Sequence, residues 1–392
     1  MSLLDLWSKS KDQLEGKHVQ QIIGIAGSGK LLDGGDASKE FRDFLSRVPS
    51  RVLAIYAEQC LADKFEGSGL ALQDIVNQIG RRLGFKVEDG RYRGTSNESG
   101  HDGLWNSTLG NTIIVEVKTT DAYRVDLGTL AGYRRRLIES GKIGEGKSSL
   151  LIIVGRQDTG DLEAQIRGSR HAWDIRLVSV EALLRLMRLK ENVEDPQILR
   201  KISEVLIPQE FTKIDGIIDL VFSTAEEVRQ DSEGQEEEEA VSEGDERKKP
   251  RPLPVNFNDA CAARIQAFLK QPLVRQTRTG YSTPDGSVFV FCAVSKAYAK
   301  PGREWYWYAF HPHQREKLAA VHEGYVAFGC GSEKIVLLIP FKRFQDWLDG
   351  MNMTQLEDRS YWHVQIYQEG NKLFLQRKKG IEKIDLTKYL VG

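Results

Sequence analysis

The spacing of apolar residues between residues 69 and 155 changes several times, and each spacing predicts a different element. Apolar residues three and four apart predict a helix that ends before Gly84, and the β-branched run from Ile113 to Val117 predicts a strand. In chain order the pattern predicts a helix over 69–83, strands over 85–88, over 91–93 or 101–105 and over 112–118, a helix over 123–140, and a strand over 149–155. The last run is continuously apolar, as in a strand buried on both faces of a sheet. The order α-β-β-β-α-β therefore predicts an α/β domain built on a mixed sheet.

The flanking regions complete a two-domain prediction. Residues 1–64 have the apolar period of helices, and further amphipathic helices are expected over 177–189 and 197–206. After a polar, highly charged stretch, strand and helix patterns mix again, as in a separate α+β domain. We therefore divide the chain into an N-terminal helical segment (1–64), a first domain (65–225), a linker (226–253) and a C-terminal α+β domain (254–392).

The predicted linker contains four consecutive glutamates, Glu236 to Glu239, and almost no apolar residues. Such a segment buries too little surface to offset its ordering entropy, which predicts a flexible connection. We expect limited proteolysis to cut between 225 and 253 and to release two folded pieces, because exposed flexible segments are preferred cleavage sites. A chain that stays intact at protease levels that digest a known flexible linker would contradict the two-domain division.

Composition narrows the class of protein. Of the 392 residues, 40% are hydrophobic and 28% are charged, the balance of an ordinary globular protein. The sequence has no run of about 18 apolar residues and no signal-peptide core at its start, so we expect no membrane segment. Its four cysteines are widely spaced, which favours reduced thiols and a cytoplasmic protein.

Candidate chemistry is concentrated in the predicted strand over 112–118. Side chains alternate along a strand, so Glu116 and Lys118 share one face with Ile114. Antiparallel pairing with the preceding segment would bring Asp102 beside Glu116. Two carboxylates suit a hard cation such as Mg²⁺, with Mn²⁺ as the alternative. A nearby lysine can orient a water molecule or neutralise developing charge, so the group fits phosphodiester hydrolysis.

Asp102, followed after thirteen residues by Glu116-Val117-Lys118, resembles the D…(D/E)-x-K signature of the PD-(D/E)xK nuclease superfamily. His101 stands where the family name has proline. The resemblance covers about residues 65–175 and implies a restriction-endonuclease-like αβββαβ core. It implies that Asp102 and Glu116 are metal ligands and that Lys118 orients the attacking water. Members often carry a glutamate on the first helix, where this chain has Gln73 and Asp74.

The function that the resemblance implies is a Mg²⁺-dependent DNA endonuclease, in restriction or another defence against foreign DNA. A DNA-repair nuclease is the alternative within the same chemistry. A catalytically silent member of the fold, which binds nucleic acid or a protein, is the alternative outside it. The non-catalytic interpretation of the Glu-x-Lys motif is a cross-strand salt bridge on a solvated face of the sheet. Retention of all three charged side chains argues for the nuclease, because such a cluster is costly to keep without a cation.

Polar residues after the strand over 149–155 are further candidates. Ligands bind at the carboxyl ends of strands in open α/β sheets, so these residues are expected to contact phosphate or to lie on a solvated helix face. They are Arg156, Gln165, Arg167 and Arg170.

The C-terminal domain is basic and aromatic. Residues 255–392 hold 19 lysines and arginines against 13 aspartates and glutamates, and 21 of the 34 aromatic residues of the chain. The segment Arg303 to Tyr308 interleaves charge with four aromatic rings, which suits phosphate contacts and base stacking. The alternative is that these rings fill both faces of a buried strand; we assign one face to the core and leave the other open. We expect this domain to select the DNA or a partner; homodimerisation remains open.

Two other motifs have weaker support. Gly24 to Lys30 fits part of a phosphate-binding loop, but Leu31 replaces the Ser or Thr that would bind Mg²⁺, so a glycine-rich turn is favoured. Two cysteines and two histidines could bind zinc, but their spacing matches no compact zinc motif. The segment His311-Pro312-His313 is better explained as the start of a helix. The four residues of the zinc site would be Cys292, His311, His313 and Cys330.

Overall fold

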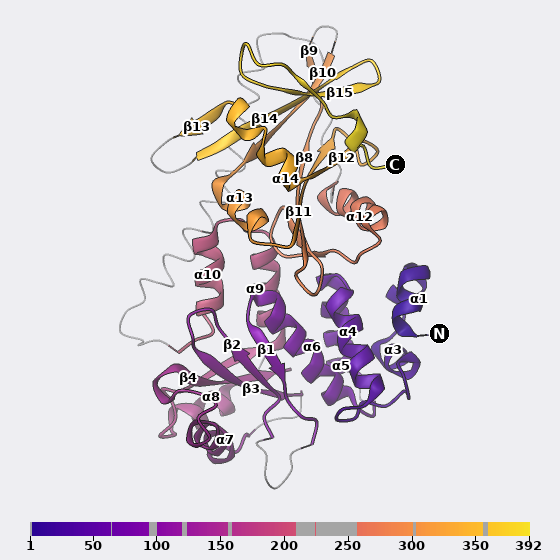
Figure 1. The fold of residues 1–392 in the computed structure, drawn as a ribbon. Helices are drawn as coiled ribbons and strands as arrows, with labels where there is room; N and C mark the ends of the chain where they lie inside the picture. Colours follow the sequence, from indigo (N-terminus) through magenta and orange to yellow (C-terminus); the bar gives the residue numbers. More distant parts are fainter. Residues whose placement is uncertain are drawn as a thin grey trace. The chain divides into compact units, whose positions relative to one another are not determined.

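The computed structural model describes residues 2–63, 65–93, 100–119, 124–155, 159–208, 224, 257–300, 303–355 and 360–392. The chain divides into two compact units, Met1–Val228 and Arg229–Gly392 (Figure 1). The predicted linker (226–253) lies outside the described residues. Both units combine helices with sheets, so the protein has a mixed α/β architecture.

The first unit begins with helices that pack on the rest of the unit through one hydrophobic core. The core joins residues from Leu3 to Leu206, including Phe41, Phe44 and Tyr56, which are fully buried. The helices predicted over 1–64 are therefore confirmed. They are α1 (Leu3–Lys9), α2 (Lys11–Glu15), α3 (Val19–Ile25), α4 (Asp36–Arg47) and α5 (Ser50–Ala62).

A five-stranded mixed sheet with the order β1-β2-β3-β4-β5 forms the centre of this unit. The pairs β1–β2 and β2–β3 are antiparallel, whereas β3–β4 and β4–β5 are parallel. Helices cover both faces, with α6 and α9 on one side and α7 and α8 on the other (Figure 1). The strands are β1 (Lys86–Asp89), β2 (Gly103–Asn106), β3 (Thr112–Lys118), β4 (Ser148–Val154) and β5 (Ile175–Ser179). The helices are α6 (Ser68–Leu83), α7 (Leu127–Glu139), α8 (Gly160–Arg167), α9 (Val180–Glu191) and α10 (Pro196–Glu204), with a 3₁₀ turn η1 (Glu145–Lys147).

The predicted helix over 177–189 is wrong at its start. Residues Ile175–Ser179 form β5, which pairs with β4, and the helix begins only at Val180. The Ser179 hydroxyl accepts a hydrogen bond from the amide of Ala182 at 3.1 Å, so it caps the helix directly after the strand. Of the two segments offered for the second strand, the later one is correct, because β2 starts at Gly103.

Helix α6 approaches the sheet closely because it has a glycine where it crosses β2. A Cβ atom on Gly80 would lie 2.5 Å from the fully buried ring of Trp105. The Trp105 indole nitrogen donates to Asn77 Oδ1 at 2.9 Å, one turn earlier on the same helix. The pairing of Gly80 with Trp105 thus sets the distance between α6 and β2.

We expect Gly80→Ala to destabilise the first unit by about 2 kcal/mol, because overpacking a close contact outweighs the better helix propensity of alanine. Thermal unfolding of the full chain measures the change. Gly24→Ala, in a helix with nothing within 4 Å of the new Cβ, is the matched control and should be neutral or stabilising. Equal stability of the two variants would contradict this account of the packing.

The second unit holds a five-stranded sheet with the order β12-β11-β8-β7-β6 and a six-stranded sheet with the order β16-β15-β14-β10-β9, in which the sixth strand, β13, pairs with β14. Residues from both sheets form one core, with Phe291 and Phe328 from the first and Phe310 and Ile366 from the second. The strands are β6 (Val274–Arg275), β7 (Gly280–Ser282), β8 (Val288–Ser295), β9 (Tyr298–Lys300), β10 (Arg303–Phe310), β11 (Glu323–Cys330), β12 (Val336–Pro340), β13 (Met353–Gln355), β14 (Ser360–Glu369), β15 (Lys372–Gln376) and β16 (Ile384–Asp385).

Helix α12 covers the other face of the first sheet through a separate core, which includes Cys261, Ile265 and Cys292. The remaining helical elements are α13 (Pro312–Ala319), α14 (Phe341–Gln345) and the short turns η2 (Leu348–Gly350) and η3 (Thr387–Tyr389); α12 itself is Phe257–Leu269. The α+β character predicted for this part of the chain is confirmed.

Candidate active site

The structure places Glu116 and Lys118 on the predicted face of β3. Ile114 packs in the core beneath α7, whereas Ile113 and Val115 pack in the core beneath α6. Glu116 and Lys118 alternate with Val115, so they share the α7 face with Ile114. Their position at the carboxyl end of β3 follows from the strand ending at Lys118.

Asp102 lies directly beside this pair, just before β2. Its amide donates to the carbonyl oxygen of Val115 at 2.9 Å, which continues the ladder between the two strands. Its carboxylate oxygen Oδ2 accepts from the amide of Val117 at 2.6 Å. Asp102 is thus held by the residues on either side of Glu116, through its amide at Val115 and through its carboxylate at Val117.

Two side chains of α6 hold the main chain of Asp102 in place. Gln73 Nε2 and Asn77 Nδ2 donate to the carbonyl oxygen of Asp102 at 3.1 and 2.9 Å. Gly103 makes room for this contact, because a Cβ atom there would lie 2.2 Å from Asn77 Oδ1. Sequence reasoning gave Asn77 no role at the site; the available signal was its spacing of four residues from Gln73, which places both amides on one face of α6.

The Lys118 ammonium donates to Glu116 Oε1 at 2.5 Å. The Glu116 side chain is only 12% exposed, and its other oxygen, Oε2, is buried without a hydrogen-bond partner. A buried carboxylate oxygen with no donor is costly unless something else satisfies it. Glu116 Oε2 is therefore an oxygen atom that remains available as a ligand.

The electrostatics of the three groups are linked. Burial, and after it the negative charge of Glu116, raise the pKa of Asp102 to about 7, although the Val117 amide and Lys118 act in the opposite direction. Burial would lower the pKa of Lys118, but its hydrogen bond to Glu116 and the charges of Glu116 and Asp102 raise it overall. The lysine stays protonated, and ionisation of Asp102 above about pH 7 places a second negative charge beside that of Glu116.

These residues fit a hard divalent cation. Mg²⁺ binds through one or two carboxylates and completes its coordination with water and phosphate oxygens. Asp102 and Glu116 supply two carboxylates, and no group of three or more His, Cys, Asp or Glu residues occurs among the described residues. A positive ion at this place would satisfy Glu116 Oε2 and would relieve the repulsion between the two carboxylates.

Of the two accessory candidates on α6, the structure brings only Gln73 to the site. The Asp74 carboxylate accepts a hydrogen bond from Arg42 Nε at 2.8 Å and another from the Tyr92 hydroxyl. Burial raises the pKa of Asp74 to about 6, against the effect of Arg42. Asp74 therefore holds the N-terminal helices and the segment after β1 together.

The candidate phosphate contacts are dispersed. Gln165 is occupied structurally, because its amide bonds both the nitrogen and the oxygen of Val125, at 3.1 and 2.6 Å. Arg167 is exposed in the last turn of α8, and Arg170 Nε bonds the ring of His171 at 3.2 Å. Arg156 lies outside the described residues, and Arg303 belongs to the second unit.

The structure distinguishes between the interpretations of the phosphate-binding-loop motif and of the zinc motif. The segment Gly24 to Lys30 begins in the last turn of helix α3 rather than after a strand, and the next helix starts only at Asp36. Gly27 and Gly29 have positive φ, so the glycine-rich turn is confirmed and no phosphate-binding loop is formed. The zinc hypothesis is wrong, because Cys292 and Cys330 belong to the cores on opposite faces of the first sheet of the second unit.

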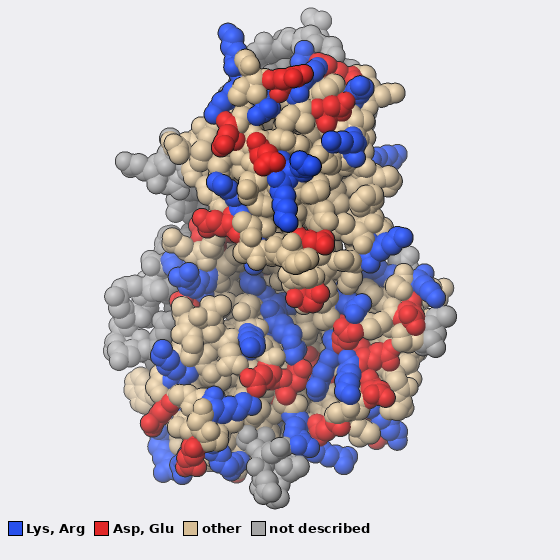
Figure 2. Space-filling model, in the orientation of Figure 1, with Lys and Arg blue, Asp and Glu red and all other residues tan. Residues whose placement is uncertain are grey.

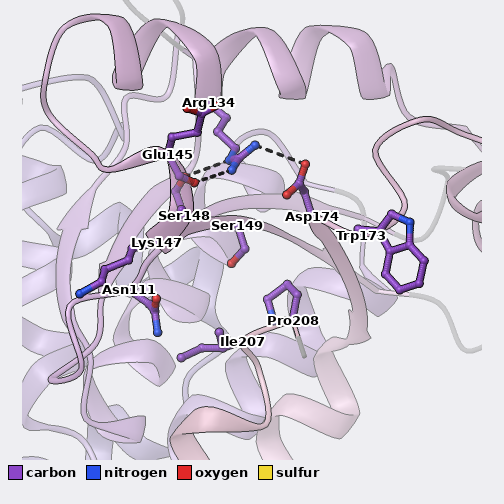
Figure 3. A pocket seen from close by; sticks show the side chains of 11 residues that line it. Asn111, Arg134, Glu145, Lys147, Ser148, Ser149, Trp173, Asp174, Ile207 and Pro208 are labelled. Atoms are coloured by element: carbon purple, nitrogen blue, oxygen red, sulfur yellow. Dashed lines mark hydrogen bonds and ion pairs between the residues drawn. The ribbon is translucent and has the colours of Figure 1, made fainter. Parts of the chain in front are cut away.

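A pocket of about 300 Å³ lies elsewhere in the first unit (Figure 3). It is lined by Asn111 and Ser148, which precede and begin β3 and β4, and so lies roughly 20 Å along the strands from Lys118. Arg134 in its wall donates to Ser148 Oγ and to the carbonyl oxygen of Glu145, and pairs with Asp174 (Figure 3). These donors are committed to the fold, and the pocket has no part in the carboxylate site.

No protein-family model matches the chain, and no curated protein matches its sequence. Among the residues that the structure describes, no helix has the length and apolar character needed to cross a membrane.

Proposed function

We propose that the first unit is a Mg²⁺-dependent DNA endonuclease with a restriction-endonuclease-like core. The observation that carries the proposal is the Asp102 carboxylate held beside Glu116 on one sheet face, with the Lys118 ammonium 2.5 Å from Glu116 and Glu116 Oε2 unsatisfied. The element order α6-β1-β2-β3-α7-β4 supports it, since this is the αβββαβ order that the resemblance implies.

Each of the three side chains has a role in this proposal. Asp102 and Glu116 would hold the cation, and hydrogen bonds from Val117, Gln73 and Asn77 preset the position of Asp102. The cation, Mg²⁺ or Mn²⁺, would lower the pKa of water and stabilise negative charge on a phosphoryl oxygen.

Lys118 is protonated and lies on the same face, so it can orient the attacking water and neutralise charge that develops on the phosphate. The assignment to restriction or another defence against foreign DNA rests on the resemblance alone.

A cleavage assay on supercoiled plasmid tests the proposal. We expect nicked and linear products with Mg²⁺ or Mn²⁺ and none with EDTA. Linear duplex and single-stranded DNA serve as further substrates, because an enzyme that needs free ends would spare the circle. Failure to cut all three substrates with either cation would reject the nuclease and leave a binding role for the unit.

A further inference from the structure

The second sheet of the second unit has one face that takes no part in the core. Along β10, Tyr306, Tyr308 and Phe310 point into the core between the sheets. Trp305 and Trp307 alternate with them, point outward and are half-buried. The tyrosines of β10 therefore fill the core, and its tryptophans lie on the opposite face of the sheet.

Four aromatic residues form a row across this outer face. The strand register pairs Phe374 with Tyr367, Tyr367 with Trp305, and Trp305 with Tyr298, so one ring comes from each of β15, β14, β10 and β9. The ring centres of Phe374 and Tyr367 are 5.7 Å apart, and those of Trp305 and Tyr298 are 4.8 Å apart and stacked. Tyr367 and Tyr298 are buried in this row, at 7% and 9% exposed, whereas Trp305 and Phe374 are half-buried and reach the surface.

Cationic side chains lie along the same row. The Lys383 ammonium is 3.9 Å from the centre of the Phe374 ring, and the Arg303 guanidinium is 5.2 Å from that of Tyr367. Lys296 lies 5.4 Å from the ring of Tyr298. Glu369 holds Lys383 and Arg303 at 2.7 and 3.9 Å, so two of the three cations are anchored next to the rings.

The composition of this face indicates what it binds. Glutamines and charged residues surround the rings, for instance Gln365 beside Trp307, so the surface differs from the continuous apolar patch of a tight protein interface. On the face that Figure 2 draws, Lys and Arg are interspersed with Asp and Glu. Because Glu369 offsets two of the cations beside the rings, stacking with local help from cations suits this surface better than binding by a broad positive field, and rings plus cations are what unpaired nucleotides require.

We propose that this outer face binds single-stranded DNA, with bases stacked on Trp305 and Phe374, the two half-buried rings of the row, and with phosphates near Arg303, Lys383 and Lys296. Bases in a duplex are already stacked on one another and do not reach such a surface, so the strand must be unpaired. The choice of DNA as the polymer rests on the proposed nuclease function, whereas the stacking geometry does not.

Binding of labelled oligonucleotides to the full-length protein in EDTA tests this proposal without any cleavage. We expect single-stranded DNA to bind more tightly than duplex, and Trp305→Leu or Phe374→Leu to weaken it by about tenfold or more. Trp305→Phe keeps a ring and should keep most of the affinity. Phe268→Leu removes an aromatic residue that is 57% exposed on α12 of the same unit, and this matched control should bind like the wild type.

Circular dichroism of each variant shows whether it is folded. Undiminished binding by folded Trp305→Leu and Phe374→Leu overturns the proposal, and so does binding of RNA but not of DNA. Plasmid cleavage with Mg²⁺, measured separately, keeps the two proposals apart: a wild type that cuts but does not bind single strands in EDTA overturns only the stacking surface. A wild type that binds single strands but does not cut overturns only the nuclease.

Discussion

Glu116→Gln and Asp102→Asn are each expected to reduce Mg²⁺-dependent plasmid cleavage by about a hundredfold or more while the protein stays folded. Each change removes one of only two carboxylates that the cation would bind, and the loss of a single charge-stabilising group in an active site typically costs that much in rate. Initial rates of nicking over a range of Mg²⁺ concentrations measure the effect. Glu88→Gln is the matched control, because this carboxylate on β1 is half exposed and pairs with Lys142 at 3.0 Å.

Lys118→Met separates binding from chemistry. It leaves both carboxylates in place and removes the ammonium that orients water, so we expect Mg²⁺ still to bind and cleavage still to be lost. Mg²⁺ binding can be followed as a rise in melting temperature, since a ligand of the native state stabilises it. Wild-type cleavage rates in Asp102→Asn would show that the site is assigned to the wrong residues, whatever the fold.

The candidate site was accessible from the sequence because its main determinants are local. The β-branched run before Lys118 predicts β3 over its observed bounds, and alternation then places Glu116 and Lys118 on one face. The pairing of Asp102 with this strand needed only the short connection between β2 and β3. Local propensity and short-range pairing thus sufficed for the three charged residues.

The support around the site depends on contacts between residues far apart in the chain. Gln73 and Asn77 reach the carbonyl oxygen of Asp102 because α6 packs closely on β2 at Gly80, and no local pattern encodes that distance. Asp74, next to Gln73, turns instead to Arg42 of the N-terminal helices. The short strand β5 escaped prediction because it runs directly into α9 at Ser179, so the helical period overrides its alternation.

In the metal-free protein, we expect Asp102→Asn to be more stable than the wild type at pH 8, by about 2 kcal/mol in the free energy of unfolding of the first unit. The pKa of Asp102 is raised from 3.8 to about 7, so the folded state binds this proton more tightly than the unfolded state does. The free energy of unfolding of the wild type therefore falls as the pH rises from about 4 to about 7, and the upper limit of this loss is roughly 4 kcal/mol. Rearrangement of the buried carboxylate pair and penetration of water reduce this loss to the smaller expected value.

Scanning calorimetry in EDTA at pH 4.5 and pH 8 measures this effect. The variant should melt about 4–8 °C higher than the wild type at pH 8, and the difference should shrink towards pH 4.5, where Asp102 is protonated in the folded wild type. Asp126→Asn is a control for which the change in stability should have the opposite sign. Asp126 caps α7 through the amide of Thr129 at 3.0 Å, and this hydrogen bond lowers the pKa of Asp126.

Addition of Mg²⁺ at pH 8 should then stabilise the wild type and leave Asp102→Asn nearly unchanged, because the cation relieves a repulsion that the variant no longer has. The carboxylate pair lowers the stability of the metal-free wild type, and cation binding restores it. This behaviour distinguishes a metal site from a structural salt bridge. A salt bridge gives the reverse order at pH 8: removal of Asp102 lowers the melting temperature, and Mg²⁺ does not restore it. That order of melting temperatures would favour a silent member of the fold over a nuclease.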